Sequence, residues 1–237
     1  PSQAGLSDLL DVFKGAGSNG DSVATTPATA NATSLTDGEM VSGLKEALNK
    51  GTRYAVENLG KDGGFLNNDR VRIPMPESLS WVEKTLRTLR QDRLADEFVA
   101  SMNHAAEQAV PEAAAIFGDA IQTMTLDDAK GILTGPDDSA TQYFRRTTSD
   151  ALTAKMRPIV EEATSRTGVT SNYKNMTEKA GGLASMFSKD TTDLDGYVTQ
   201  KTLDGLFLMV AEEEKRIREN PLARSSDLLQ KVFGAFQ

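Results

Sequence analysis

Apolar residues recur at intervals of three and four positions along most of the chain, which is the spacing of one face of an α-helix. The alternation of apolar and polar residues that marks a β-strand does not appear in the sequence. The pattern predicts an all-α fold with helices over residues 36–59, 77–89, 92–123, 125–135, 139–167 and 193–220, and a short helix after Ser226.

The predicted helices have recognisable ends and interruptions. The stretch "TDGE" beginning at Thr36 resembles a capping box, and Thr125 and Gly135 are typical boundary residues of a short helix. Pro111 and Pro158 fall inside helical patterns, where the proline ring clashes with the preceding turn. We therefore expect a kink or a break at Pro111 and a kink at Pro158.

The segment 193–220 has the strongest helical pattern. Its middle, "GLFLMVA" from Gly205 to Ala211, is apolar on every side, so we expect it to be the buried centre of an irregular helical bundle. Glycine costs a helix about 1 kcal/mol relative to alanine, and Gly205 therefore indicates close approach of another helix. The charged end of the segment predicts two ion pairs at i,i+4, Glu212 with Arg216 and Glu214 with Arg218.

Changes in composition along the chain indicate its domain organisation. Residues 1–14 have a short amphipathic helical pattern, residues 15–35 are typical of a flexible linker, and residues 36–237 are expected to form a single helical domain. The "SDLL" and "VF" of the first segment are repeated from Ser226 onward. We expect the second copy to dock on its own bundle. The first copy has two alternatives, docking on the same bundle or contact with a partner or a neighbouring chain.

The stretch "GFLNNDRVRIPMP" at residues 64–76 interrupts the helical pattern. Its prolines favour extended backbone and its Gly and Asn residues tolerate turns, so we expect a fixed, extended loop whose apolar side chains dock on the helices. Two interpretations stay open. In the first, the loop closes one end of the bundle, its asparagines bond their own backbone and an arginine pairs with a surface carboxylate. In the second, four side chains line the mouth of a polar pocket: Asn67, Asn68, Arg70 and Arg72.

Charge and cysteine content narrow the classes of function. The chain has 26 Lys and Arg against 34 Asp and Glu, a net charge of −8, which disfavours binding to nucleic acid or anionic lipid. It has no cysteine, which excludes disulfides, thiolate metal ligands and cysteine nucleophiles. The longest apolar run, residues 206–211, is far shorter than the roughly 20 residues of a membrane span. Because the chain begins at Pro1 rather than Met, we expect processing or trimming that would remove an export signal.

The sequence predicts no metal, catalytic or cofactor site. The single histidine, His104, is expected at an exposed polar position, on the side of its helix that carries Glu97, Ser101 and Gln108. Without cysteine or a second histidine a zinc site is disfavoured, and no "GxSxG" motif supports a serine triad. The stretch "DTTDLDG" at residues 190–196 lacks the acidic residues that begin and end a calcium loop, so it is expected to cap a helix.

Two further sets of charged residues carry weaker signals. Arg145 and Arg146 are candidates for binding an anion, although an ordinary i,i+4 pair of Arg146 with Asp150 is the favoured interpretation. A hydrolytic enzyme of novel type would need distant carboxylates, such as Asp119, Asp127 and Asp150, to converge in a cleft beside an arginine. Spacing along the sequence does not bring them together.

Three long runs carry a resemblance to a known family: "GFLNNDRVRIPMPESLSWVEKTLRTL", "SMNHAAEQAVPEAAAIFGDAIQTMTLDDAKGILTGPDDSATQYFRRTTSDAL" and "YVTQKTLDGLFLMVAEEEKRIRENPLAR". Over about residues 36–236 the chain resembles the bacterial domain-of-unknown-function family 4197. The resemblance implies a Gram-negative protein made with an export or lipoprotein signal, and hence a periplasmic or envelope-attached location. It brings no catalytic residues.

These observations favour a non-enzymatic envelope protein that binds an apolar small ligand or lipid inside the bundle, because helices kinked at Pro111 and Pro158 can leave space between them. The alternative is a protein interaction or scaffold module of the envelope. A third hypothesis is an enzyme of novel type that uses Asp or Glu with Arg. A deep apolar cavity would favour the first hypothesis, and a flat exposed patch would favour the second.

Overall fold

A computed structural model describes residues 36–166, 193–220 and 226–235. The α-helices are α1 (Asp37–Leu59), α2 (Ser80–Thr88), α3 (Asp92–Ala109), α4 (Ala113–Thr123), α5 (Leu126–Thr134), α6 (Ser139–Arg166), α9 (Leu194–Glu219) and α10 (Asp227–Ala235). No strand occurs among these described residues, so the all-α prediction is confirmed. The chain divides into two units, residues 1–34 and 35–237, and the fold is that of the second. The predicted helix 1–14 and linker 15–35 lie outside the described residues.

The helices α1, α5 and α9 begin where polar side chains satisfy the first backbone N–H groups. At α1, Thr36 Oγ1 accepts the Glu39 N–H at 3.2 Å, and the Glu39 carboxylate accepts the Thr36 N–H at 3.0 Å. Thr125 and Asp128 form the same reciprocal capping box at α5, and Asp193 caps α9. The caps predicted at the three positions are confirmed.

The two prolines in helical patterns have different effects. Pro111 lies in a 3-10 turn, Val110–Glu112, that separates α3 from α4, so the predicted break is confirmed. By contrast, α6 continues through Pro158 without a break. Pro158 is exposed to solvent, where water can reach the carbonyl group that loses its hydrogen bond.

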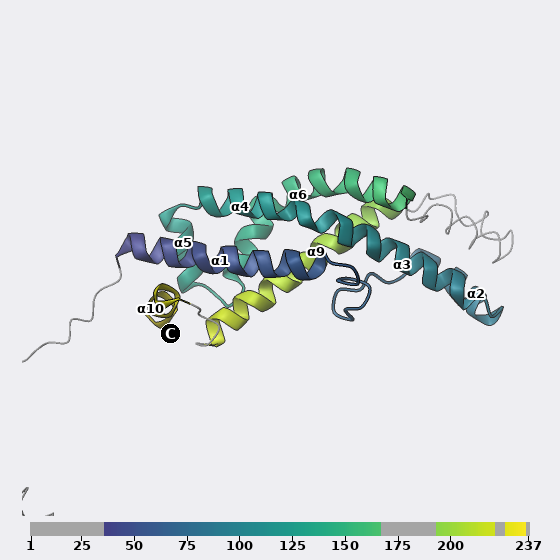
Figure 1. Cartoon of the computed structure of the whole chain (residues 1–237), viewed down its shortest axis with the longest axis horizontal. Helices are drawn as coiled ribbons and strands as arrows, with labels where there is room; N and C mark the ends of the chain where they lie inside the picture. Colours follow the sequence, from purple (N-terminus) through teal and green to yellow (C-terminus); the bar gives the residue numbers. More distant parts are fainter. Residues whose placement is uncertain (1–35, 167–192, 221–225, 236–237) are drawn as a thin grey trace, which may run out of the picture. The chain divides into compact units, whose positions relative to one another are not determined.

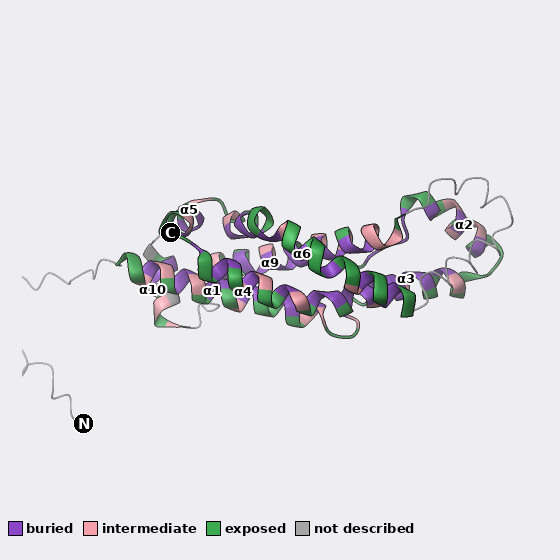
Figure 2. Cartoon of the chain, turned by 90° about the horizontal axis from the view of Figure 1, so that it is seen from above, coloured by how far each residue is buried: buried purple, intermediate pink, exposed green. Residues whose placement is uncertain are grey.

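The helix α9 lies at the centre of the bundle, where it contacts α1, α3 and α6 (Figure 1). Its apolar middle is buried, apart from Leu208, whose surface is 37% exposed, and the half-buried Ala211. Figure 2 shows that buried residues lie on the inner sides of the helices and exposed residues on the outer sides. The aromatic ring of Phe207 in α9 meets that of Phe117 in α4 at 6.2 Å between centroids, and Phe117 meets Phe144 in α6 at 4.9 Å. The predicted buried central helix is confirmed.

One of the two ion pairs predicted on α9 is confirmed and the other is wrong. Arg218 Nη2 lies 2.8 Å from Glu214 Oε1. Arg216 pairs with the buried Glu213 at 2.6 Å rather than with Glu212, because this direction also places its guanidinium 5.8 Å from the ring centroid of Tyr54 in α1.

Gly205 marks a close approach, but the approaching segment is the loop rather than a helix. A Cβ atom at Gly205 would lie 2.8 Å from Phe65 Cε1 and 3.2 Å from Val71 Cβ, both in the loop that follows α1. Phe65 is fully buried, so its ring has little room to move. The glycine therefore allows the loop to lie directly on the central helix.

Replacing Gly205 with alanine is expected to lower the free energy of unfolding by about 1–2 kcal/mol, because the added methyl group overpacks the contact with Phe65. Gly131→Ala in α5 is a matched control, since no atom lies within 4 Å of a Cβ atom there. The control is expected to gain about 0.5–1 kcal/mol from the higher helix propensity of alanine. Urea unfolding of both variants measures the difference, and shifts of the same sign would contradict the contact.

The helix α10 packs on α1, as predicted for the second "SDLL" copy. Its Val232 and Phe233 side chains are buried, and Lys231 Nζ lies 2.8 Å from Glu39 Oε1. The hydrogen bond from Lys231, followed by the bonds from Thr36, lowers the pKa of Glu39 from 4.5 to about 2. The pair therefore connects the first turn of α1 to the last described helix.

The contribution of Glu39 to stability is expected to depend on pH. Its folded pKa lies below its ordinary value, so the stabilisation is complete above about pH 4.5 and is lost as the pH falls toward 2. Lys231→Met should therefore lower the melting temperature at pH 6 and have little effect near pH 2. Lys215→Met, which removes an exposed pair with Glu219, is the control. A melting-temperature difference that stays constant between pH 6 and 2 would contradict this role.

Candidate functional site

The loop of residues 60–76 joins α1 to the 3-10 turn Glu77–Leu79 that precedes α2. Leu66 is only half-buried, but the other apolar side chains of the loop are buried against the helices, as predicted: Phe65, Val71, Ile73 and Met75. A buried segment without helical hydrogen bonds needs other partners for its backbone N–H and C=O groups. Side chains of α3 and α9 provide several of them.

Asn103 of α3 binds the loop through both ends of its side-chain amide. Its Oδ1 accepts the N–H of Ile73 at 2.8 Å, and its Nδ2 donates to the carbonyl of Ile73 at 2.9 Å. The same nitrogen donates to Val99 within α3 at 2.8 Å. Asn103 is fully buried, so these bonds fix the position of Ile73 in a site without competing water.

Glu107 lies one turn further along α3 and binds the other side of the loop. Its Oε1 accepts the backbone N–H groups of Phe65 at 2.9 Å and Leu66 at 3.0 Å. Its Oε2 lies 2.9 Å from Nδ1 of His104. The side chain of Glu107 is only 5% exposed, so a carboxylate is held inside the protein by three polar partners.

The central helix holds the loop from the α9 side. The hydroxyl of Tyr197 donates to the carbonyl of Pro74 at 3.1 Å, and burial of the phenol raises the pKa of Tyr197. Arg70 pairs with Glu212, the residue that sequence spacing assigned to Arg216. The loop thus has polar contacts to two helices in addition to its apolar ones.

The outer surface of the loop forms one wall of a cleft of about 650 Å³ that is open to solvent. The backbone turns sharply at Gly63, which has a φ of 74° that disfavours other residues. Asn68 Oδ1 accepts the N–H of Arg70 at 3.2 Å and fixes a second turn. The cleft is lined by Tyr54, Asn58, Lys61, Asp62, Gly63, Gly64, Asn67, Asn68, Asp69, Arg70 and Met209.

The structure brings three of the six predicted binding residues together in this cleft, namely Asn67, Asn68 and Arg70. Arg72 is exposed and lies outside the lining. Two features of the first interpretation, in which the loop only closes the bundle, are also present. Asn68 bonds the backbone of the loop, and Arg70 pairs with a carboxylate.

The two arginines predicted in α6 lie elsewhere. The guanidinium carbon of Arg145 is 4.6 Å from the ring centroid of Phe207. That of Arg146 is 5.8 Å from the ring centroid of Tyr143, and the expected pair of Arg146 with Asp150 is wrong. Stacking on a neighbouring ring replaces the ion pair at this exposed position.

The carboxylates proposed for an enzyme do not form one group. Asp119, Asp127 and Asp150 are all exposed. Asp127 lines a hollow of about 330 Å³ together with Asp128 and Arg146, and the other two carboxylates lie outside its lining. Asp128 is engaged in capping α5, and its hydrogen bonds to Thr125 lower its pKa. The convergence that hydrolysis requires is missing from this hollow.

The expectation that His104 lies at an exposed polar position is wrong. His104 is half-buried, Ser101 on the same side of the helix is buried, and His104 Nδ1 faces both Glu107 and Asp62. The distance from Nδ1 to Asp62 Oδ1 is 3.6 Å. A nitrogen and two carboxylate oxygens therefore lie within 4.8 Å of one another. The spacing of "HAAE" at residues 104–107 was the available signal, because i,i+3 side chains meet on a helix.

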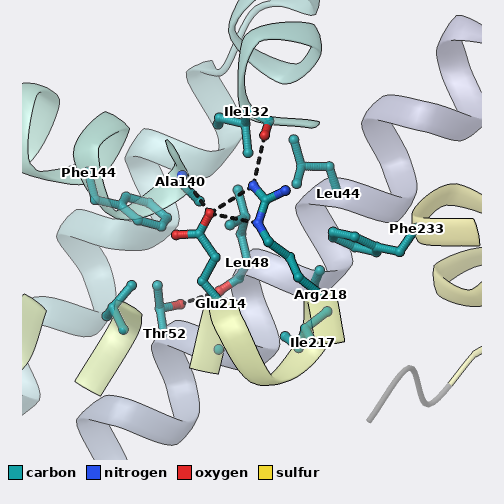
Figure 3. Close-up of a pocket in the computed structure, with 13 residues that line it drawn as sticks. Leu44, Leu48, Thr52, Ile132, Ala140, Phe144, Glu214, Ile217, Arg218 and Phe233 are labelled. Carbon is teal, nitrogen blue, oxygen red and sulfur yellow. Dashed lines mark hydrogen bonds and ion pairs between the residues drawn. The ribbon is translucent and has the colours of Figure 1, made fainter. Parts of the chain in front are cut away.

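One cavity that the described residues line inside the bundle has little space for a ligand. Figure 3 shows the cavity between α1, α6, α9 and α10, with the apolar side chains of Leu44 and Phe233 on one side. Its volume is about 20 Å³, and a single water molecule needs roughly 10–15 Å³. The buried carboxylate of Glu214 closes its polar end, beside Arg218.

Glu214 serves the bundle as a remote helix cap. Its two oxygens accept the N–H groups of Ala140 and Thr141 in the first turn of α6, each at 2.9 Å. Arg218 neutralises the carboxylate and donates to the carbonyl of Ile132 at 2.8 Å (Figure 3). These contacts satisfy buried polar groups and leave none of them directed at empty space.

Comparison with known proteins gives one match. The model of a family described as "Protein of unknown function (DUF4197)" matches residues 34–234. No curated protein and no solved structure matches the chain. Within the described part of the chain, every helix is too short or too polar to cross a membrane.

Glu107→Ala is expected to lower the free energy of unfolding by about 2–4 kcal/mol, because the buried N–H groups of Phe65 and Leu66 lose their acceptor. Glu97→Ala is the matched control on the same helix, where an exposed carboxylate lies 3.6 Å from Arg93. Its expected cost is below about 0.5 kcal/mol. Denaturant unfolding gives both values, and amide exchange at Phe65 should accelerate in the first variant alone. Equal costs would show that Glu107 does not hold the loop.

Proposed function

The chain belongs to the DUF4197 family of proteins of unknown function, and from this premise we propose that it is a non-enzymatic interaction module. The cleft beside the loop of residues 60–76 receives a polar segment of a partner polypeptide. The observation that carries the proposal is a cleft of about 650 Å³ whose loop wall is anchored by buried side chains of α3.

Anchoring favours binding because the wall of the cleft is ordered before a partner arrives. Asn103 and Glu107 bind the inner edge of the loop, so the outer edge is free to present its groups. A preorganised site does not have to lose conformational entropy again when a ligand binds. The volume also lies within the range of roughly 300–1,000 Å³ that is usual for binding sites.

The chemistry of the lining suits a polypeptide. The amides of Asn58, Asn67 and Asn68 can both donate to and accept from a peptide backbone. Tyr54 and Met209 add apolar surface, and Tyr54 is 43% exposed. Charges of both signs are present, from Lys61, Asp62, Asp69 and Arg70, so a strongly charged ligand of either sign gains little.

An apolar ligand inside the bundle has less support, because the interior cavity has room for about one water molecule. The envelope location implied by the family resemblance is also part of the proposal. Fractionation of cells that make the full chain tests this location independently of the cleft.

Photocrosslinking tests the cleft directly. Replacing Tyr54 with p-benzoylphenylalanine keeps an aromatic ring at the cleft, and the same replacement at Leu89 provides a control at a 53% exposed position on another surface. After irradiation of cells that make the full chain, we expect a covalent adduct with one polypeptide from position 54 and none from position 89. Adding Asn67→Ala should reduce the adduct several-fold.

Two results would contradict the proposal. One is equal adducts from positions 54 and 89, which would indicate random encounters with neighbouring proteins. The other is the absence of an adduct at 54 when circular dichroism shows that the protein is folded.

A further inference from the structure

We propose that Asp62, His104 and Glu107 bind one divalent transition-metal ion of the Zn²⁺ or Mn²⁺ class at the edge of the cleft. The inference rests on side chains from two elements, the loop after α1 and the helix α3. It goes beyond the interaction role and does not depend on which partner the cleft receives.

The distances among the donor atoms fit a single ion. His104 Nδ1 lies 2.9 Å from Glu107 Oε2 and 3.6 Å from Asp62 Oδ1. Bonds from zinc to imidazole nitrogen and carboxylate oxygen are about 2.0–2.2 Å long, so two ligands at right angles lie about 3 Å apart and two at a tetrahedral angle about 3.4 Å apart. Both separations from His104 therefore fit one ion. The carboxylate oxygens of Asp62 and Glu107 lie within 4.8 Å of each other, and the exposed side chain of Asp62 can move closer to complete the site.

The ligand set selects the class of metal. Imidazole nitrogen together with two carboxylate oxygens suits Zn²⁺, Mn²⁺, Fe²⁺, Co²⁺ or Ni²⁺, whereas Ca²⁺ prefers a shell of oxygen ligands. The chain has one histidine and no cysteine, so His104 is its only strong nitrogen or sulfur side-chain ligand. Removing this residue should abolish affinity for a transition metal throughout the chain.

Hydrogen bonds around Glu107 orient its carboxylate for metal binding. Its Oε1 accepts the N–H groups of Phe65 and Leu66, which directs Oε2 toward His104. Outer hydrogen bonds of this kind fix the orientation of a carboxylate ligand and strengthen metal binding. The buried side of the site is therefore preorganised by the same bonds that anchor the loop.

The other side of the site is open. The side chain of Asp62 is 95% exposed and lines the cleft. Three protein ligands leave coordination positions for water or for an oxygen of a bound molecule. An ion here would place positive charge at the edge of the cleft, where a carboxylate or carbonyl group of a partner could bind it.

Calorimetry with metal alone tests the inference on the full chain. After treatment with a chelator and dialysis, titration with Zn²⁺ is expected to show one site. Asp62→Ala should weaken affinity at least about tenfold and His104→Ala should remove the site, by loss of one ligand each. Glu97→Ala, which removes an exposed carboxylate on the same helix, should leave affinity unchanged.

A second readout avoids variants that fail to fold. In the unaltered protein the ring protons of the single histidine are resolved by NMR, and substoichiometric Mn²⁺ should broaden them selectively. Unchanged histidine signals, or Zn²⁺ affinity that is the same in His104→Ala, would overturn the site and leave His104 as a hydrogen-bond partner of Glu107. Crosslinking at position 54 is performed without added metal, so failure of either proposal can be distinguished from failure of the other.

Discussion

The bonds from Asn103 and Glu107 to the loop are the interactions on which the site depends. A stretch of non-helical backbone crosses the interior of an otherwise helical protein, and water cannot satisfy its polar groups there. The side chains of Asn103 and Glu107, at i,i+4 on α3, provide hydrogen-bond partners for these groups instead. Without them, Phe65 would have no fixed position on Gly205, and the wall of the cleft would have no defined shape.

The same solution appears at a second place in the bundle. Glu214 accepts two consecutive N–H groups at the start of α6, as Glu107 does in the loop. The two carboxylates differ in their neutralising partner, since Glu214 has a close arginine whereas Glu107 faces a histidine. A permanent cation closes the first site, whereas the second faces an imidazole, which is a common metal ligand. Both carboxylates therefore hold backbone groups, and the metal site is proposed only at Glu107.

Local rules predicted the helices well and the site poorly. Capping at Thr36 and the break at Pro111 depend on neighbours within one turn, which the sequence displays directly. The partners of Asn103 and Glu107 are 30 to 42 residues away, so no periodic pattern reveals them. The available signal was a polar pair at i,i+4 beside the apolar residues Met102, Ala105 and Ala106. Sequence spacing also does not decide which of two adjacent carboxylates an arginine pairs with. Arg216 pairs with Glu213 rather than Glu212, on the side where Tyr54 of the neighbouring helix lies.

The packing of α10 on α1 also has a consequence for the order of events during synthesis. About 170 residues separate the end of α1 from the start of α10, and a ribosome that adds about 5–20 residues per second needs roughly 10–30 s to make them. Throughout that interval the part of α1 that α10 covers lacks its partner, although α4, α5 and α9 are made earlier and pack on other parts of α1. The contact between α1 and α10 therefore forms after α10 has left the ribosome, and truncation within α10 removes the buried side chains of Val232 and Phe233 from the core.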